Sequence, residues 1–121
     1  MTTPFVAVVD DDMALCSSLV DLLRSFGYRA ESFASAEAFL TSDSGVGADC
    51  IIADIHMPGV GGLDLLRELR ERDVLTPVIL ITGLPDKHLD EEATVRGALC
   101  VLRKPLDTRA LFACIERSPP K

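Results

Sequence analysis

The segment Cys50-Ile51-Ile52-Ala53-Asp54, followed closely by Met57-Pro58-Gly59, decides the fold of this sequence. An apolar run of this length between turn residues predicts a strand that is buried on both faces of a sheet. The run ends on Asp54, which places this carboxylate at the carboxyl end of a central strand. In open parallel α/β sheets, ligands bind in the crevice beyond that end of the strands. Asp54 is therefore a candidate functional residue from its position alone.

Three other apolar runs predict buried strands, and each is followed by polar residues. They are Phe5–Val9 before Asp10, Asp11 and Asp12, Pro77–Ile81 before Thr82, and Ala98–Leu102 before Arg103 and Lys104. Residues 28–33 alternate between apolar and polar side chains, which indicates a half-exposed edge strand. Helical spacing and capping residues predict helices between Asp12 and Gly27, from Ser35 to Leu40, after Gly62, from Asp86 to Arg96 and after Asp107.

This alternation of five strands with five helices predicts an α/β fold, a doubly wound parallel sheet with right-handed crossovers. With the polar strand at the edge, the arrangement is the flavodoxin-like (βα)5 fold with strand order 2-1-3-4-5 and a switch point between the first and third strands. Residues 1–117 form one expected domain, and residues 118–121 are expected to be a tail or the start of a linker.

Composition limits the function classes. A net charge of -7 argues against direct nucleic-acid binding, because such binding depends on Lys and Arg. No apolar run is long enough for a membrane span and the N-terminus lacks a signal-peptide pattern, so we expect a cytoplasmic protein. The four cysteines are far apart and include no C-x-x-C pair, so we expect buried free thiols.

The carboxylates of Asp10, Asp11 and Asp54 are expected to converge at the switch point, where their mutual repulsion and burial call for a neutralising cation. Oxygen ligands that leave room for water and phosphate suit Mg²⁺. Thr82 and Lys104 end the neighbouring strands and supply a hydroxyl donor and an ammonium group. Together these groups indicate phosphoryl transfer to a carboxylate nucleophile.

The sequence resembles the response-regulator receiver domains of two-component signalling. The matching segments are Val9-Asp10-Asp11, Asp54 with Met57-Pro58-Gly59 and Gly62-Leu63, Ile81-Thr82-Gly83, and Lys104-Pro105. They occur in the family's order and extend across essentially the whole chain. Any one of them is a weak signal, but four motifs at the ends of four strands are specific.

The resemblance implies that Asp54 accepts a phosphoryl group from a histidine kinase or a histidine phosphotransfer protein. It implies that Asp11, Asp54 and the main-chain carbonyl of His56 hold Mg²⁺, with Asp10 acting mostly through a metal-bound water. The domain would then catalyse only its own phosphorylation and dephosphorylation. We expect the side chain of His56 to line the entrance of the site, either as an exposed loop histidine or as one that tunes the lifetime of the phosphoryl group. We expect Asp12 to cap a helix rather than bind the metal.

The resemblance also implies a switch. Lys104 would pair with the phosphoryl group, Thr82 would donate a hydrogen bond to it, and the Lys104-Pro105 bond would be cis. The helix from Asp86 to Arg96 has few large apolar residues, so we expect it to be marginal, mobile and part of the switch.

The face that such a switch would reshape consists of the fourth helix, the last strand and the last helix, including Val95, Val101 and Ala110. It would engage an output domain, a downstream protein or a second copy in a phosphorylation-dependent homodimer. Val101 occupies a position that is usually aromatic in the family. Signalling would then run through the backbone and the fourth helix, or it would be weakened.

The main rival is a haloacid-dehalogenase-like phosphatase, which also combines an aspartate nucleophile, Mg²⁺, a hydroxyl and a lysine. Those enzymes place a second Asp two residues after the nucleophile, where this sequence has His56, and the chain is short with no obvious cap domain. An interaction module that is never phosphorylated is a further alternative. It is disfavoured because every expected active-site residue is retained.

Overall fold

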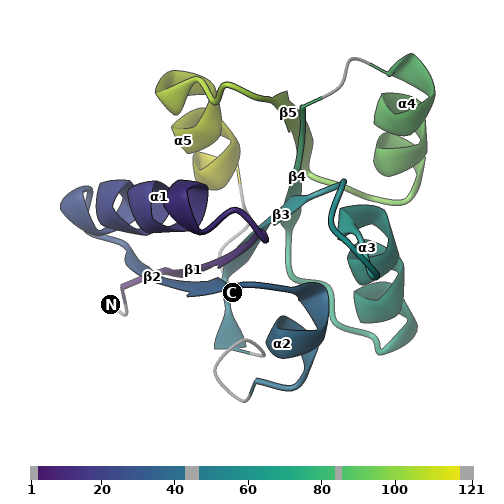
Figure 1. The fold of residues 1–121 in the computed structure, drawn as a ribbon, viewed down its shortest axis with the longest axis horizontal. Coiled ribbons are helices and arrows are strands. Elements are labelled where there is room, and N and C mark those ends of the chain that lie inside the picture. The colour runs from purple at the N-terminus through teal and green to yellow at the C-terminus, as the bar shows by residue number, and fades with distance from the viewer. Residues whose placement is uncertain (1–2, 43–46, 84–85, 118–121) are drawn as a thin grey trace.

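The structure is a computed structural model that describes residues 3–42, 47–83 and 86–117. Its elements are β1 (Phe5–Val9), α1 (Met13–Ser25), β2 (Arg29–Phe33), α2 (Ala36–Leu40), β3 (Cys50–Asp54), α3 (Gly62–Glu71), β4 (Val78–Thr82), α4 (Lys87–Val95), β5 (Cys100–Arg103) and α5 (Thr108–Glu116). The strands form one parallel sheet in the order β2-β1-β3-β4-β5 (Figure 1). The predicted fold class and strand order are confirmed.

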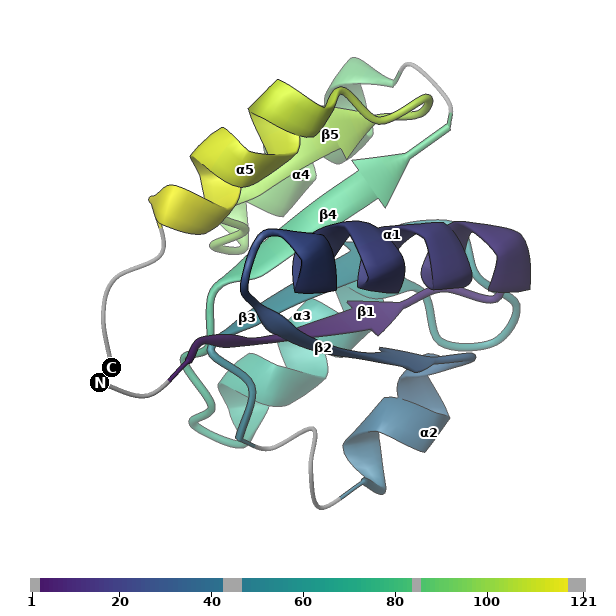
Figure 2. The ribbon, with the colours of Figure 1, turned by 90° about the vertical axis from the view of Figure 1, so that its left-hand side faces the viewer.

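The helices cover both faces of the sheet, as Figure 2 shows. Helices α1 and α5 pack on one face, and α2, α3 and α4 pack on the other. Successive residues of β3 therefore enter different cores: Ile51 and Ala53 contact the layer of α2, α3 and α4, whereas Cys50 and Ile52 contact the layer of α1 and α5. Because both faces are covered, β3 has no polar residue before Asp54.

Side-chain caps fix where several helices begin. The carboxylate of Asp12 accepts a hydrogen bond from the backbone N–H of Leu15 (3.1 Å), so the expectation that Asp12 is a helix cap is confirmed. Helix α3 instead begins at Gly62, where an added Cβ would lie 2.7 Å from the carbonyl oxygen of Asp54. Only glycine allows α3 to start so close to the end of β3.

Three strands differ slightly from their predicted ranges, and β2 begins at Arg29 rather than at residue 28. β4 extends to Thr82 rather than ending at Ile81, and β5 is Cys100–Arg103 rather than 98–102. Pairing between neighbouring strands sets these limits, and Thr82 pairs with Arg103. The predicted tail at 118–121 lies outside the described residues. Across the ranges that the structure describes, none of the helices has the length and apolar character needed to cross a membrane.

The expectation that all four cysteines are free thiols is wrong for one pair. Cys100 on β5 and Cys114 on α5 form a disulfide, with their Cα atoms 6.3 Å apart. These residues are separated by 14 positions and belong to different elements, so sequence spacing did not indicate their contact. Cys16 and Cys50 remain buried thiols.

Candidate functional site

Parallel register places the polar residues that follow β1, β3, β4 and β5 at one edge of the sheet. Val9 pairs with Ala53, Asp54 pairs with Ile81, and Thr82 pairs with Arg103. The residue after each of β1 and β5, Asp10 and Lys104 respectively, therefore lies near Asp54 and Thr82. This is the switch point predicted from the strand order.

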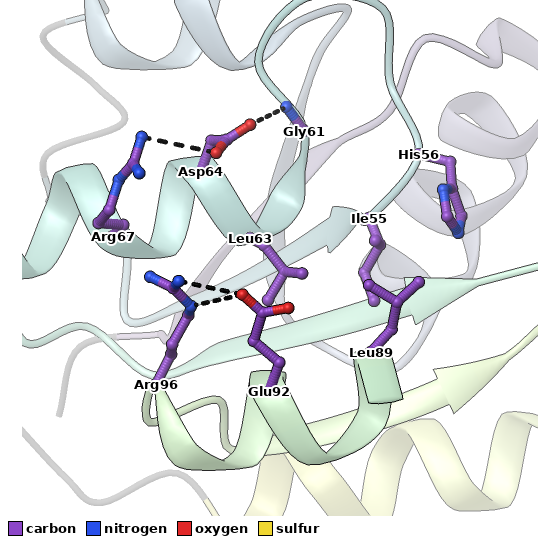
Figure 3. A pocket seen from close by; sticks show the side chains of 9 residues that line it. All are labelled: Ile55, His56, Gly61, Leu63, Asp64, Arg67, Leu89, Glu92 and Arg96. Atoms are coloured by element: carbon purple, nitrogen blue, oxygen red, sulfur yellow. Dashed lines mark hydrogen bonds and ion pairs between the residues drawn. The ribbon is translucent and has the colours of Figure 1, made fainter. Parts of the chain in front are cut away.

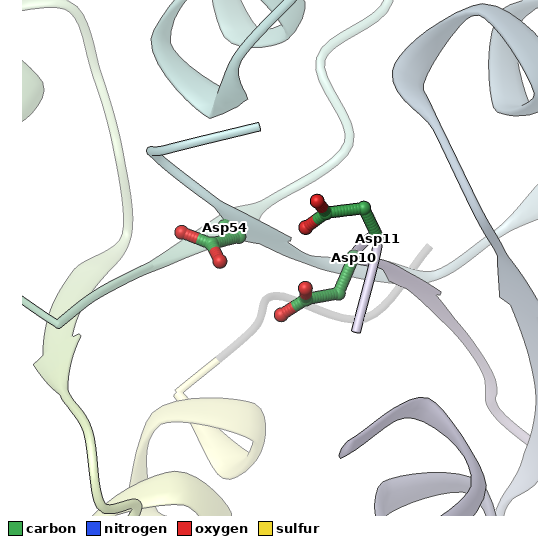
Figure 4. A group of neighbouring side chains, drawn as sticks. All are labelled: Asp10, Asp11 and Asp54. Atoms are coloured by element: carbon green, nitrogen blue, oxygen red, sulfur yellow. The ribbon is translucent and has the colours of Figure 1, made fainter. Parts of the chain in front are cut away.

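Three carboxylates meet at this edge, as Figure 4 shows. Asp10, Asp11 and Asp54 each offer an oxygen within 4.8 Å of the others. Asp10 is 1% exposed and Asp54 is 4% exposed, whereas Asp11 is exposed to solvent. The buried pair supplies fixed oxygens, and Asp11 forms the open side of the cluster.

Lys104 is the cationic partner of the two buried carboxylates. Its Nζ donates a hydrogen bond of 2.8 Å to Oδ2 of Asp54 and lies 3.4 Å from Oδ2 of Asp10. The segment that carries it is fixed by a hydrogen bond of 2.9 Å from the backbone N–H of Lys104 to the carbonyl oxygen of Thr82. The Lys104-Pro105 bond is cis, as the family resemblance implied.

The charges of this cluster are coupled. Burial raises the pKa of the Asp10 carboxyl above its ordinary value; the backbone N–H of Asp12 and the charge of Lys104 oppose the shift, and the charge of Asp54 adds to it. Burial by itself would lower the pKa of Lys104, but the hydrogen bond to Asp54 and the charges of both carboxylates outweigh it, so the net shift is upward. Lys104 therefore stays protonated at neutral pH.

Asp10 retains capacity for another ligand. Its Oδ1 accepts a hydrogen bond of 2.9 Å from the backbone N–H of Asp12, but its buried Oδ2 accepts none. The ammonium of Lys104 lies 3.4 Å from this oxygen but is shared with Asp54, so it offsets only part of the cost of burying two carboxylates. Together with the three converging carboxylates, this oxygen fits a divalent cation with oxygen ligands.

The remaining predicted residues surround the cluster. Thr82 is fully buried at the end of β4. The backbone N–H of His56 donates to Oδ1 of Asp54 (2.9 Å), and this bond orients the carboxylate. The side chain of His56 is exposed and lines a cavity of about 280 Å³ between α3 and α4 (Figure 3).

Sequence reasoning did not predict that cavity. Most of its other lining residues come from these two helices, and they include the ion pairs of Asp64 with Arg67 in α3 and of Glu92 with Arg96 at the end of α4. Such pairs are ordinary features of exposed helical faces. Nothing in the spacing of either segment indicates that the two helices enclose a common space.

The chain matches the family model of the response regulator receiver domain over residues 6–116. It is 44% identical over 115 residues to the transcriptional regulatory protein FixJ of Azorhizobium caulinodans, covering 93% of this chain and 54% of that protein. It is 36% identical to the response regulator protein TmoT of Ectopseudomonas mendocina, covering 91% of this chain and 50% of that one. The chain thus spans about half the length of these curated relatives.

Solved structures agree with these relationships. The crystal structure of FixJ-N superposes with a TM-score of 0.88 at 33% identity, covering 98% of this chain and 94% of that one. The response regulator StyR superposes with a TM-score of 0.86 at 34% identity, covering 97% of this chain and 59% of that one. This chain therefore belongs to the response regulator receiver domains of two-component signalling.

Proposed function

We propose that this domain is a Mg²⁺-dependent phosphoacceptor switch in which Asp54 receives the phosphoryl group. The donor is the phosphohistidine of a histidine kinase or of a histidine phosphotransfer protein. The observation that carries the proposal is the contact of Lys104 with Asp54 beside Asp10, because it joins a nucleophile, its acidic neighbours and a cation at the end of buried strands. The domain catalyses only its own phosphorylation and dephosphorylation.

In this proposal each residue has a separate role. Asp10, Asp11, Asp54 and the main-chain carbonyl of His56 hold the Mg²⁺, with Asp10 acting mostly through water. When bound, Mg²⁺ supplies positive charge beside the transferring phosphoryl oxygens. A carboxylate oxygen of Asp54 forms the new bond to phosphorus while the bond from phosphorus to the donor nitrogen breaks.

Two residues then respond to the new group. The ammonium of Lys104, which donates to Asp54 in the present structure, pairs with a phosphoryl oxygen. The hydroxyl of Thr82 donates to another phosphoryl oxygen. Because Lys104 follows β5 directly and Thr82 ends β4, both movements act on strands that adjoin α4 and α5.

The surface formed by α4, β5 and α5 changes on phosphorylation and binds the partner that receives the signal. It includes Val95, which is 86% exposed, together with Val101 and Ala110. Partners proposed for it are an output domain, a downstream protein or a second copy in a phosphorylation-dependent homodimer. The half-length match to the relatives supports an output domain as one such partner. Val101 is partly buried against the core and has no aromatic ring to reorient, so the change passes through the backbone and α4.

The test is labelling with acetyl phosphate and Mg²⁺, followed by intact-mass measurement and a phosphate-affinity gel. We expect the wild-type protein and Asp21→Asn, which alters an exposed carboxylate on α1, to be labelled equally. We expect Asp54→Asn to show no label. EDTA should also prevent labelling of the wild type.

Equal labelling of Asp54→Asn and wild type would eliminate the assignment of Asp54. Labelling that proceeds unchanged in EDTA would eliminate the role of the metal. A protein that no phosphodonor labels, acetyl phosphate or phosphorylated kinase, would instead be an interaction module.

A further inference from the structure

The disulfide between Cys100 and Cys114 lies away from the acidic cluster and joins two elements that otherwise pack without covalent contact. Cys100 is the first residue of β5, and Cys114 lies in the second half of α5. We propose that these two cysteines form a reversible redox site, oxidised by small-molecule disulfides such as oxidised glutathione and reduced by thiols, that controls how firmly α5 is held on β5.

Geometry makes the pair competent for reversible bonding. The Cα separation of 6.3 Å lies within the range that disulfides require, so the sheet and helix need not move apart or together for the bond to form. Both sulfurs lie on the sheet face covered by α1 and α5, where Leu111 and Ile115 already anchor α5. The dithiol and the disulfide are therefore compatible with the same packing.

The two cysteines differ in access, which gives them different roles. Cys100 is partly exposed, and Nη1 of Arg117 donates to its Sγ at 3.4 Å. A neighbouring guanidinium favours the thiolate, the form that attacks a disulfide. Cys114 is 6% exposed, so it is placed to attack second, from inside the protein.

The reaction balances as two exchanges. The Cys100 thiolate attacks one sulfur of oxidised glutathione, forming a mixed disulfide and releasing one glutathione thiolate. The Cys114 thiol loses its proton and attacks the Cys100 sulfur, forming the protein disulfide and releasing the second glutathione. The two glutathione thiolates take up the two protons. Overall, the protein dithiol is oxidised and one glutathione disulfide is reduced to two thiols.

The other two cysteines are more deeply buried than Cys100. Cys16 is 1% exposed and Cys50 is 2% exposed. The Sγ of Cys16 donates to the carbonyl oxygen of Asp10 (3.2 Å), and burial together with the charge of Asp10 raises the pKa of its thiol. Both thiols are expected to resist oxidation while the protein is folded.

The first test is thiol trapping. The folded protein is equilibrated in glutathione buffers from fully reduced to fully oxidised, quenched in acid, alkylated and measured by mass spectrometry. We expect Cys100 and Cys114 to lose reactivity together and to appear in one disulfide-linked peptide, reversibly on return to reduced glutathione. Cys50→Ala is the matched control and should retain this behaviour. Cys114→Ser should stop at a glutathione adduct on Cys100.

Several results would overturn the proposal: Cys100 and Cys114 remaining alkylatable in oxidised glutathione, oxidation that reduced glutathione does not reverse, or Cys16 and Cys50 oxidising in step with the pair.

Arg117→Gln tests the positioning role of Arg117. It should slow mixed-disulfide formation about threefold near neutral pH and leave the rate unchanged at alkaline pH, where thiols ionise unaided. An equal slowing at every pH would reject that role.

The second test measures hydrogen exchange in both redox states. We expect the amides of α5 to exchange at least about tenfold more slowly in the oxidised protein, while the amides of α3 are unchanged. Cys100→Ser in oxidising buffer should match the reduced wild type. Identical α5 exchange in the two states would refute control of α5. Both tests are independent of Asp54 phosphorylation, so their outcome is separate from that of the proposed function.

Discussion

The centre of the sheet and its β5–α4 edge are held in different ways. β1, β3 and β4 are buried along their whole lengths, whereas β5 is half-buried and ends exposed at Arg103. Four residues of α3 are buried, but Ala93 is the one residue of α4 that reaches this level of burial. The carboxylates therefore stand on the best-packed part of the domain, beside an edge where rearrangement disrupts few buried contacts.

Lys104 connects the two regions, because it follows β5 and contacts Asp54 at the end of β3. A change of charge at Asp54 thus acts directly on the weaker edge while the central strands keep the carboxylates in place. The contrast places the carboxylates on firmly packed strands beside a less buried edge.

The largest expected effect tests the packing contrast itself. Leu66→Ala removes a fully buried side chain of α3 and should lower the free energy of unfolding by about 2–5 kcal/mol. Val95→Ala alters a residue of α4 that is 86% exposed and should change it by less than about 0.5 kcal/mol. Urea denaturation measures both. Similar losses for the two variants would contradict the contrast.

The next largest loss of stability is expected at Lys104, which connects the two regions. Lys104→Ala leaves Asp10 and Asp54 without their cation and should cost about 1–3 kcal/mol in EDTA at neutral pH. Because folding raises the Lys104 pKa, its stabilisation is present below the ordinary value of 10.5 and is lost as pH rises through the folded-state pKa. The gap between wild type and variant should therefore narrow in strong alkali.

Lys87→Ala, which removes an exposed lysine of α4, is the control for that measurement. If it destabilises the protein as much as Lys104→Ala does, the contact with Asp54 has no special weight. In the proposed switch, Lys104→Ala should also impair output more than phosphoryl occupancy. A variant that is phosphorylated and drives output normally would reject that coupling role.

Substitution of Asp10 should have a smaller effect on stability, and it should stabilise the protein rather than destabilise it. Its raised pKa means that the folded state binds the proton more tightly, so stability falls as pH rises above the ordinary value of 3.8. Asp10→Asn should therefore raise Tm in EDTA at neutral pH, by about 4 °C for each kcal/mol gained, and the gain should shrink toward acidic pH. Calorimetry with Asp21→Asn as the control tests this; a lower Tm at neutral pH would contradict it.

The smallest loss of stability is expected from the ion pair between β5 and α4 at the edge of the domain. Nη2 of Arg103 lies 3.4 Å from Oδ2 of Asp90, and the arginine side chain is 56% exposed. Asp90→Asn should cost less than about 1 kcal/mol, comparable to Glu92→Gln, which weakens the pair with Arg96 on the same helix. A loss above about 2 kcal/mol in urea denaturation would mean that the edge is held as firmly as the centre.

Much of the fold was predictable because its signals are local. The apolar runs around Ile52 and Val8 required burial on both faces, and Asp12 and Ser35 cap the helices that they were predicted to cap. Strand limits were less accurate, since the apolar run before Thr82 does not reveal where pairing with β5 ends.

The sequence alone determined the order of the elements and placed polar residues at the carboxyl ends of four strands, because hydrophobic periodicity and turn chemistry act over a few neighbouring residues. Only the tertiary structure decided that Lys104 reaches Asp54 at 2.8 Å, that Oδ2 of Asp10 lacks a hydrogen bond, and that Cys100 meets Cys114. These contacts join distant segments, and their distances depend on how strands pair and how helices pack on the sheet, which local patterns do not specify.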